Sequence, residues 1–339
     1  MIRRPPRSTL DRSSAASDVY KRQGLNAVAT RRGVLTGSVA QGLAITVPIA
    51  VPIFFIVGLI TQNLAITASL PVKSYVLLSI AGITHFLVGR YANYRATKAI
   101  GANLVGPIIS SSLIITLILA ITFLDEVMTP ARVLGIVLIV LGPAIILQSP
   151  AIKFKTQTNL SEPSFTPKLM EGYIFGIICA IAFGTTPIFI RSAFLDIGET
   201  NVGHGIIGGL LSYIAATLLL GIYLINPTNL RHALSIDENA KKWFILTGLF
   251  VCISQMLRFM ALAIAPVSVV APIIQSSGVF RTIFGWFINR EHEVFDIWVI
   301  IGNLTAIVGG TTLTISTETI LTILNPPPLI SEFLKWRWP

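Results

Sequence analysis

Long apolar runs separated by short polar turns make up most of the chain. Nine runs reach the length of about 17 residues or more that crosses a bilayer as a helix. Their approximate limits are 34–60, 75–92, 99–123, 131–149, 172–193, 204–225, 243–264, 267–288 and 296–316. The pattern predicts an all-α fold, a polytopic transmembrane helical bundle with nine spans. Short connections such as 124–132 predict that successive helices lie antiparallel.

Composition supports a membrane protein and excludes a soluble globule. The 339 residues are 53% hydrophobic and 12% charged, whereas soluble domains carry about a quarter charged residues. The net charge of +10 is spread over the N-terminal segment, loops and helix ends, where basic residues set membrane orientation. We therefore expect the lipid bilayer as a partner and no nucleic acid. Cys179 and Cys252 lie inside apolar runs, which predicts neither a disulfide nor a cysteine metal site.

The first segment differs from the rest. Residues 1–23 have no apolar stretch, and the composition changes at Gly24, so they are not a signal peptide. They could be a disordered basic tail or a transit peptide, although Asp11 and Asp18 weaken the second interpretation. The string also resembles translated sequencing adaptor, which is the interpretation we favour. We exclude this segment from the fold.

The chain contains an internal repeat. Residues 105–112 and 270–277 are identical at six of eight positions, at an offset of 165. The same offset pairs Glu126 with Glu291 and, after a two-residue slip, Gly135 and Gly142 with Gly302 and Gly309. The predicted units are a truncated first repeat (24–149), a polar linker (150–171), a second repeat (172–316) and a tail (317–339).

Eight of the nine spans pair between the repeats, and 172–193 has no partner. The first repeat therefore lacks its first helix, at the place where residues 1–23 now stand. An intact chain would hold five plus five helices. Because five is odd, its halves insert with opposite orientation, which is the inverted-repeat plan of secondary transporters.

Several motifs resemble a known family. The first repeat contains "YRATKAIGANLVGPI", "LDE" and "TPARVLGIVLIVLG", and the second contains "ALAIAPVSVVAPI", "NRE" and "WVIIGNLTAIVGG". Over roughly residues 34–316 the chain resembles the EamA-type repeat of the drug/metabolite transporter superfamily. The resemblance implies a ten-helix permease of the bacterial inner membrane that moves metabolites or amino acids, often outward. The absent first helix, which in such proteins helps line the central cavity, departs from the pattern.

Ionisable residues inside spans are functional candidates, because their insertion costs several kcal/mol. Arg258 and Arg281 could bind a substrate carboxylate or phosphate; alternatively, their long stems reach the interface. No Asp or Glu lies well inside a predicted span. His85 could relay protons, or it is a packed histidine with a hydrogen-bonded ring.

Prolines interrupt three predicted helices. Pro107 and Pro272 occupy equivalent positions and free the backbone carbonyls of Asn103 and Ser268. Interrupted helices line the site of inverted-repeat carriers, so we favour a functional role for this pair. Pro187 forms a cavity-lining kink or a simple bend.

Polar side chains near the arginines and prolines complete the candidate substrate site. Ser254 and Gln255 lie one turn from Arg258 and would share its cavity. The other candidates are Gln275, Ser110, Ser111, Ser276 and Ser277. Hydroxyl residues also mediate helix–helix contacts in membranes, and for any single serine we favour packing.

Enzyme signatures are absent from the sequence. It contains no HExxH, no Gly-rich phosphate loop and no Cys/His cluster, so we expect no catalytic residue, metal site or cofactor. We predict an alternating-access carrier of a small polar or anionic metabolite or amino acid, for which a homodimer is one possible assembly. The alternative is a polytopic membrane enzyme or lipid-handling protein with an interfacial site.

Overall fold

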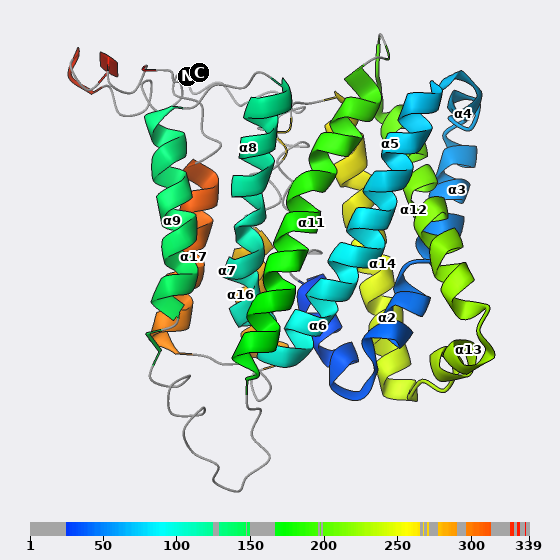
Figure 1. Ribbon diagram of the computed structural model, residues 1–339, viewed down its shortest axis with the longest axis horizontal. Helices are drawn as coiled ribbons and strands as arrows, with labels where there is room; N and C mark the ends of the chain where they lie inside the picture. The colour runs from blue at the N-terminus through cyan, green and yellow to red at the C-terminus, as the bar shows by residue number, and fades with distance from the viewer. Residues whose placement is uncertain are drawn as a thin grey trace, which may run out of the picture.

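The computed structural model describes a helical bundle in residues 25–124, 129–146, 148–149, 167–195, 197, 199–264, 267, 270, 277–289, 296–312, 326–328, 331–332 and 336 (Figure 1). A helix over 25–36 comes first. It is followed by α2 (Val39–Thr46), α3 (Ala50–Ile60), α4 (Ile66–Ser69), α5 (Val72–Gly82), the π-helix η1 (Ile83–Gly89), α6 (Arg90–Ile100), α7 (Ala102–Ser110), α8 (Ser112–Leu124), α9 (Pro130–Ile146), α11 (Leu169–Leu195), α12 (Val202–Leu224), α13 (Pro227–Leu234), α14 (Glu238–Ile264), α16 (Ser277–Ile288) and α17 (Ile297–Thr312).

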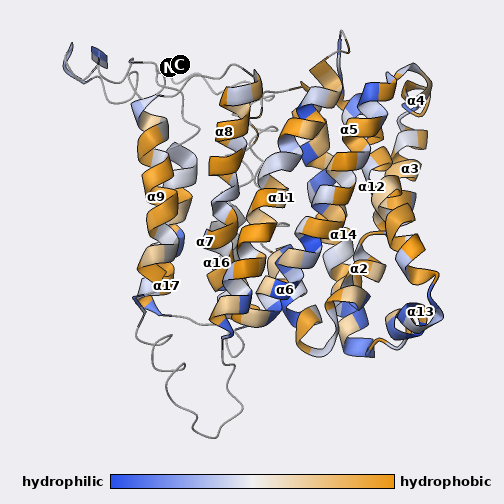
Figure 2. Ribbon diagram, viewed as in Figure 1, coloured by the Kyte–Doolittle hydropathy of each residue, from blue (hydrophilic) through white to orange (hydrophobic). Residues whose placement is uncertain are grey.

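Six helical segments of the described chain are long and apolar enough to cross a membrane. Two further apolar helices, Val133–Ile146 and Ile297–Thr312, are shorter, and the expected span 267–288 is described continuously only from residue 277. Large apolar side chains such as Leu218 and Phe287 are exposed, and orange, hydrophobic residues predominate along the long helices (Figure 2). An apolar exterior suits lipid. The chain is thus an integral, multi-pass, all-helical membrane protein.

Two expected boundaries are wrong, because capping residues and Gly101 override the apolar pattern. The span expected over 34–60 is broken before α2, where Ser38 and Gln41 form a capping box. The helix expected to end at residue 92 continues as α6 to Ile100. It stops at Gly101, whose φ of 85° a residue with a side chain rarely adopts.

The repeat is visible in the contact between α9 and α17, which pack side by side (Figure 1). A Cβ on Gly142 would lie 2.8 Å from the carbonyl oxygen of Gly302, and one on Gly302 would lie 2.6 Å from that of Gly142. A Cβ on Gly309 would lie 2.8 Å from the carbonyl oxygen of Gly135. Gly135 and Gly142 are the repeat equivalents of Gly302 and Gly309. Exchanging the repeats therefore exchanges these two contacts, as a pseudo-twofold axis between α9 and α17 requires.

An arginine caps the equivalent helix of each repeat. Arg31, on the helix over 25–36, is fully buried and donates from Nη1 to the carbonyls of Thr97 (2.8 Å) and Lys98 (3.2 Å) near the end of α6. Arg191, on α11, donates from Nη1 to the carbonyls of Leu262 and Ala263, both at 3.4 Å, near the end of α14. These acceptors match at the repeat offset of 165, and cations are favourable at helix C-termini.

The helix over 25–36 is therefore the counterpart of the second half of α11. This finding corrects the expectation that the segment 172–193 has no partner in the first repeat. The capped ends of α6 and α14 lie at opposite ends of the bundle (Figure 1), as inverted repeats require.

We expect Gly142→Ala to destabilise the protein, because the new methyl group would meet the backbone of α17. Overpacking of this kind costs about 1–3 kcal/mol, measurable by unfolding in mixed micelles. Gly221→Ala is the matched control, since a Cβ there meets nothing within 4 Å. Equal stabilities of the two variants would contradict the close contact.

Candidate functional site

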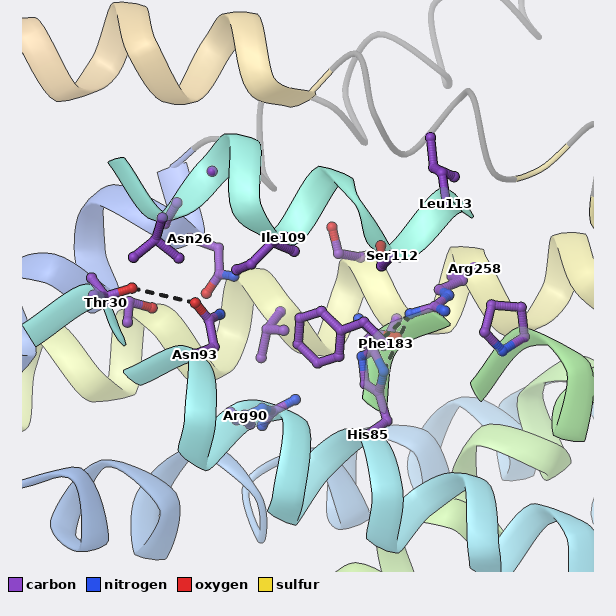
Figure 3. A pocket seen from close by; sticks show the side chains of 18 of the residues that line it. Asn26, Thr30, His85, Arg90, Asn93, Ile109, Ser112, Leu113, Phe183 and Arg258 are labelled. Carbon is purple, nitrogen blue, oxygen red and sulfur yellow. Dashed lines mark hydrogen bonds between the residues drawn. The ribbon is translucent and has the colours of Figure 1, made fainter. Parts of the chain in front are cut away.

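A cavity of about 150 Å³ lies inside the bundle (Figure 3). The walls come from the helix over 25–36 and from η1, α6, α7, α8, α11 and α14. Residues that line it include Asn26, Thr30, His85, Arg90, Asn93, Tyr94, Thr97, Val105, Ser112, Thr116, Phe183, Pro187, Ser254, Gln255, Arg258 and Val270.

Both repeats contribute equivalent positions to the cavity. At the offset of 165, Arg90 matches Gln255 and Asn93 matches Arg258, and all four residues line it. Val105 and Val270 are a further equivalent pair. The cavity therefore lies at the interface of the repeats, where inverted-repeat transporters bind their substrates.

Arg90 is held by the surrounding helices. Its Nη1 donates to the carbonyl of Thr46 (2.9 Å) and its Nη2 to the hydroxyl of Tyr213 (3.1 Å). Its guanidinium lies 5.0 Å from the ring centroid of Phe86, which stacks on Tyr213 at 3.7 Å. Arg90 was missed from the sequence because the predicted helix ended at residue 92. The offset that pairs it with Gln255 was the signal that could have found it.

Arg258 and His85 meet inside the cavity, as Figure 3 shows. Nη1 of Arg258 lies 3.3 Å from Nε2 and 3.5 Å from Nδ1 of His85. The His85 ring also stacks on Phe183, with centroids 4.3 Å apart. Because His85 lies near the middle of the helical segment Val72–Ile100, the guanidinium is within the bundle and not at the helix end. η1, which carries His85, is a π-helix, a form frequent at functional sites.

One face of α14 presents polar atoms without partners. Ser254 and Gln255, which the sequence placed with Arg258, line the same cavity. Ser254 Oγ, Gln255 Oε1 and Arg258 Nε are buried and have no hydrogen-bond partner among the described residues. An unsatisfied buried polar group costs about 1–3 kcal/mol. A polar ligand in the cavity would satisfy these groups.

Pro107 lies inside α7, between the cavity-lining residues Val105 and Ser112. The carbonyl of Asn103, four residues before Pro107, accepts a hydrogen bond from Asn303 Nδ2 on α17 (3.3 Å). The Ser111 hydroxyl donates to the carbonyl of Ile108 (2.6 Å) in its own helix. The cavity-lining serine of this segment is Ser112, one residue further on.

The remaining candidates divide between one cavity residue and several that are not described. Pro187 lies inside α11 and lines the cavity. Pro272, Gln275, Ser276 and the side chain of Arg281 lie outside the described residues, as do Glu126 and Glu291, the glutamates paired by the repeat. Within the described part of the chain, no group of three or more His, Cys, Asp or Glu could hold a metal ion.

Comparisons with known proteins agree with the repeat. The family model of the EamA-like transporter family matches residues 23–148 and 170–315, one match for each repeat. A solved structure described only as "Crystal structure of protein" is similar, with a TM-score of 0.57 and 14% identity over 89% of this chain and 96% of that chain. At this identity the likeness shows the fold alone. No curated protein matches the sequence.

We expect water to reach the cavity from at least one side of the membrane. In a background with Cys179 and Cys252 replaced by serine, Ser254→Cys should react with an anionic methanethiosulfonate faster than Leu218→Cys. Leu218 is 66% exposed on the apolar exterior, where a thiol stays protonated, and the thiolate is the reactive form. Mass spectrometry gives both rates, and equal rates would contradict an aqueous cavity.

Proposed function

Because the chain belongs to the EamA-like transporter family, we propose that it moves a small polar or anionic metabolite, or an amino acid, by alternating access. The substrate would bind in the cavity between the repeats, with Arg258, Gln255 and Ser254 as its contacts. We place the protein in a bacterial inner membrane, with export as the expected direction.

The observation that carries this proposal is the position of the cavity between the two repeats. Equivalent residues of oppositely oriented helices, Arg90 with Gln255 and Asn93 with Arg258, face the same space. In such a pair of inverted repeats, rocking of one against the other exposes a fixed site to each side in turn. A polar interior within an apolar exterior suits the passage of a polar solute.

We expect Arg258→Ala to reduce transport about tenfold or more, because hydrogen bonds to charged groups contribute about 1.5–3 kcal/mol. The assay is counterflow in proteoliposomes, with a mixture of isotope-labelled amino acids and small organic acids followed by mass spectrometry. Lys241→Ala is the matched control. Lys241 lies on the same helix, and its side chain forms an exposed ion pair with Glu238 (3.7 Å).

Two results would contradict the proposal. Counterflow at the wild-type rate in the Arg258→Ala variant would show that the transported solute does not bind in this cavity. Solutes that emerge chemically modified, with no exchange of unmodified solute, would favour a polytopic membrane enzyme or lipid-handling protein instead.

A further inference from the structure

We propose that His85 and Arg258 form one site that binds a small monocarboxylate together with one proton. This inference rests on the proposed function, since it identifies the substrate class and the coupling ion of the same cavity. Four observations carry it: the charge balance of the cavity, the contact between the two side chains, the unpartnered polar atoms of α14, and the small volume.

The charge balance of the cavity favours an anion. Two arginines line it, and its described lining contains neither Asp nor Glu. Arg90 already donates to Thr46 and Tyr213 and stacks on Phe86. The guanidinium of Arg258 contacts the ring of His85, and its Nε has no partner among the described residues. The donors of Arg90 are thus engaged by neutral groups, whereas Arg258 keeps donors for a ligand, so we expect one carboxylate to bind at Arg258.

The contact with Arg258 favours a neutral His85. A guanidinium has donors and no acceptor, and a doubly protonated imidazole also has donors only. Nη1 of Arg258 lies within 3.5 Å of both ring nitrogens, so a proton on the ring would place a second positive charge against the guanidinium. Protonated His85 and Arg258 would be two adjacent cations without an acceptor between them.

A bound carboxylate removes this conflict. It accepts hydrogen bonds from Arg258 in place of His85, and its negative charge offsets a proton on the ring. The proton moves from the aqueous phase to a ring nitrogen of His85 that Arg258 has left. The site holds one net positive charge before and after, because the anion and the proton cancel. Each ligand therefore strengthens the binding of the other, as reciprocal linkage demands.

The charged groups around His85 are few in the described chain. Arg258 acts on it from α14 and Arg90 from α6. α11 presents the uncharged ring of Phe183, and on α12 Tyr213 is the hydrogen-bond partner of Arg90. The described residues around His85 thus supply no negative charge. An incoming carboxylate would be the negatively charged partner of a protonated His85.

The cavity also limits the size and shape of the ligand. About 150 Å³ suits a solute of a few heavy atoms, and a carboxylate is the planar anion that matches a guanidinium. Ser254 and Gln255 lie on the same face of α14 as Arg258, and Ser254 Oγ and Gln255 Oε1 have no partner among the described residues. They would bind a hydroxyl or similar group on the same molecule.

The test measures binding and proton uptake by the full chain in lipid nanodiscs, with L-lactate as the probe. Calorimetry in two buffers of different ionisation enthalpy should give about one proton taken up per lactate. The dissociation constant of lactate should rise by up to ~tenfold per pH unit at pH values above the pKa of His85 in the free protein, because binding then requires the uptake of a proton. Lactamide, a neutral molecule of the same shape, should not bind.

Two variants locate the effect. His85→Gln should bind lactate without proton uptake and without pH dependence, whereas His232→Gln, which changes a histidine of α13 away from the cavity, should behave as wild type. Arg258→Ala should lose lactate binding. Since proton uptake is measured on the wild-type protein, the test does not depend on the folding of any variant.

Several outcomes would overturn the inference: lactate binding without proton uptake, equal binding of lactamide, equal or tighter binding of inorganic phosphate, or no lactate binding at millimolar concentration. Each leaves the transport proposal intact. Proton-coupled lactate binding without counterflow would contradict the transport proposal and not this site.

Discussion

A guanidinium buried inside a membrane protein needs acceptors from within the bundle, because lipid offers none. Arg31 and Arg191 find theirs at helix ends, and Arg90 finds its own in Thr46 and Tyr213. These side chains tie together helices that are distant in sequence. Arg258 is different, because its contact inside the bundle is an imidazole. Three of these arginines thus build the structure, and Arg258 is the one that we propose binds a ligand.

The duplicated plan explains why these contacts occur in pairs. Arg31 and Arg191 cap equivalent helices at opposite ends of the bundle, and the glycines of α9 and α17 meet in two equivalent contacts. The cavity lies between the repeats, but its chemistry is not symmetric. The first repeat has its arginine at position 90, and the second has its own at position 258. The position equivalent to 90 is 255, so the two arginines differ by about one helical turn. Because of that difference, Arg90 is hydrogen-bonded to Thr46 and Tyr213, whereas Arg258 contacts His85 and is the arginine that we propose binds a ligand.

The sequence predicted the features that depend on composition and repetition. Apolar runs located the helices, the offset of 165 found the repeat, and the rarity of charge inside spans identified Arg258 and His85. Details that depend on packing were missed. Periodicity does not reveal that α6 continues to Gly101, so Arg90 seemed to lie near a helix end. It also could not tell that Ser111 bonds to its own helix while Ser112 faces the cavity.

The π-helix η1 has a consequence for how this chain tolerates change. A π-turn holds about one residue more than an α-turn, and each residue of an α-helix turns the chain by about 100°. His85 lies within the seven residues of η1, and Arg90 follows directly. Deleting one residue between 83 and 89 would rotate α6 as a unit and turn Asn93 and Thr97 away from the cavity, although no cavity side chain would change. The lining of the cavity is therefore set by the number of residues in η1 as well as by their identity.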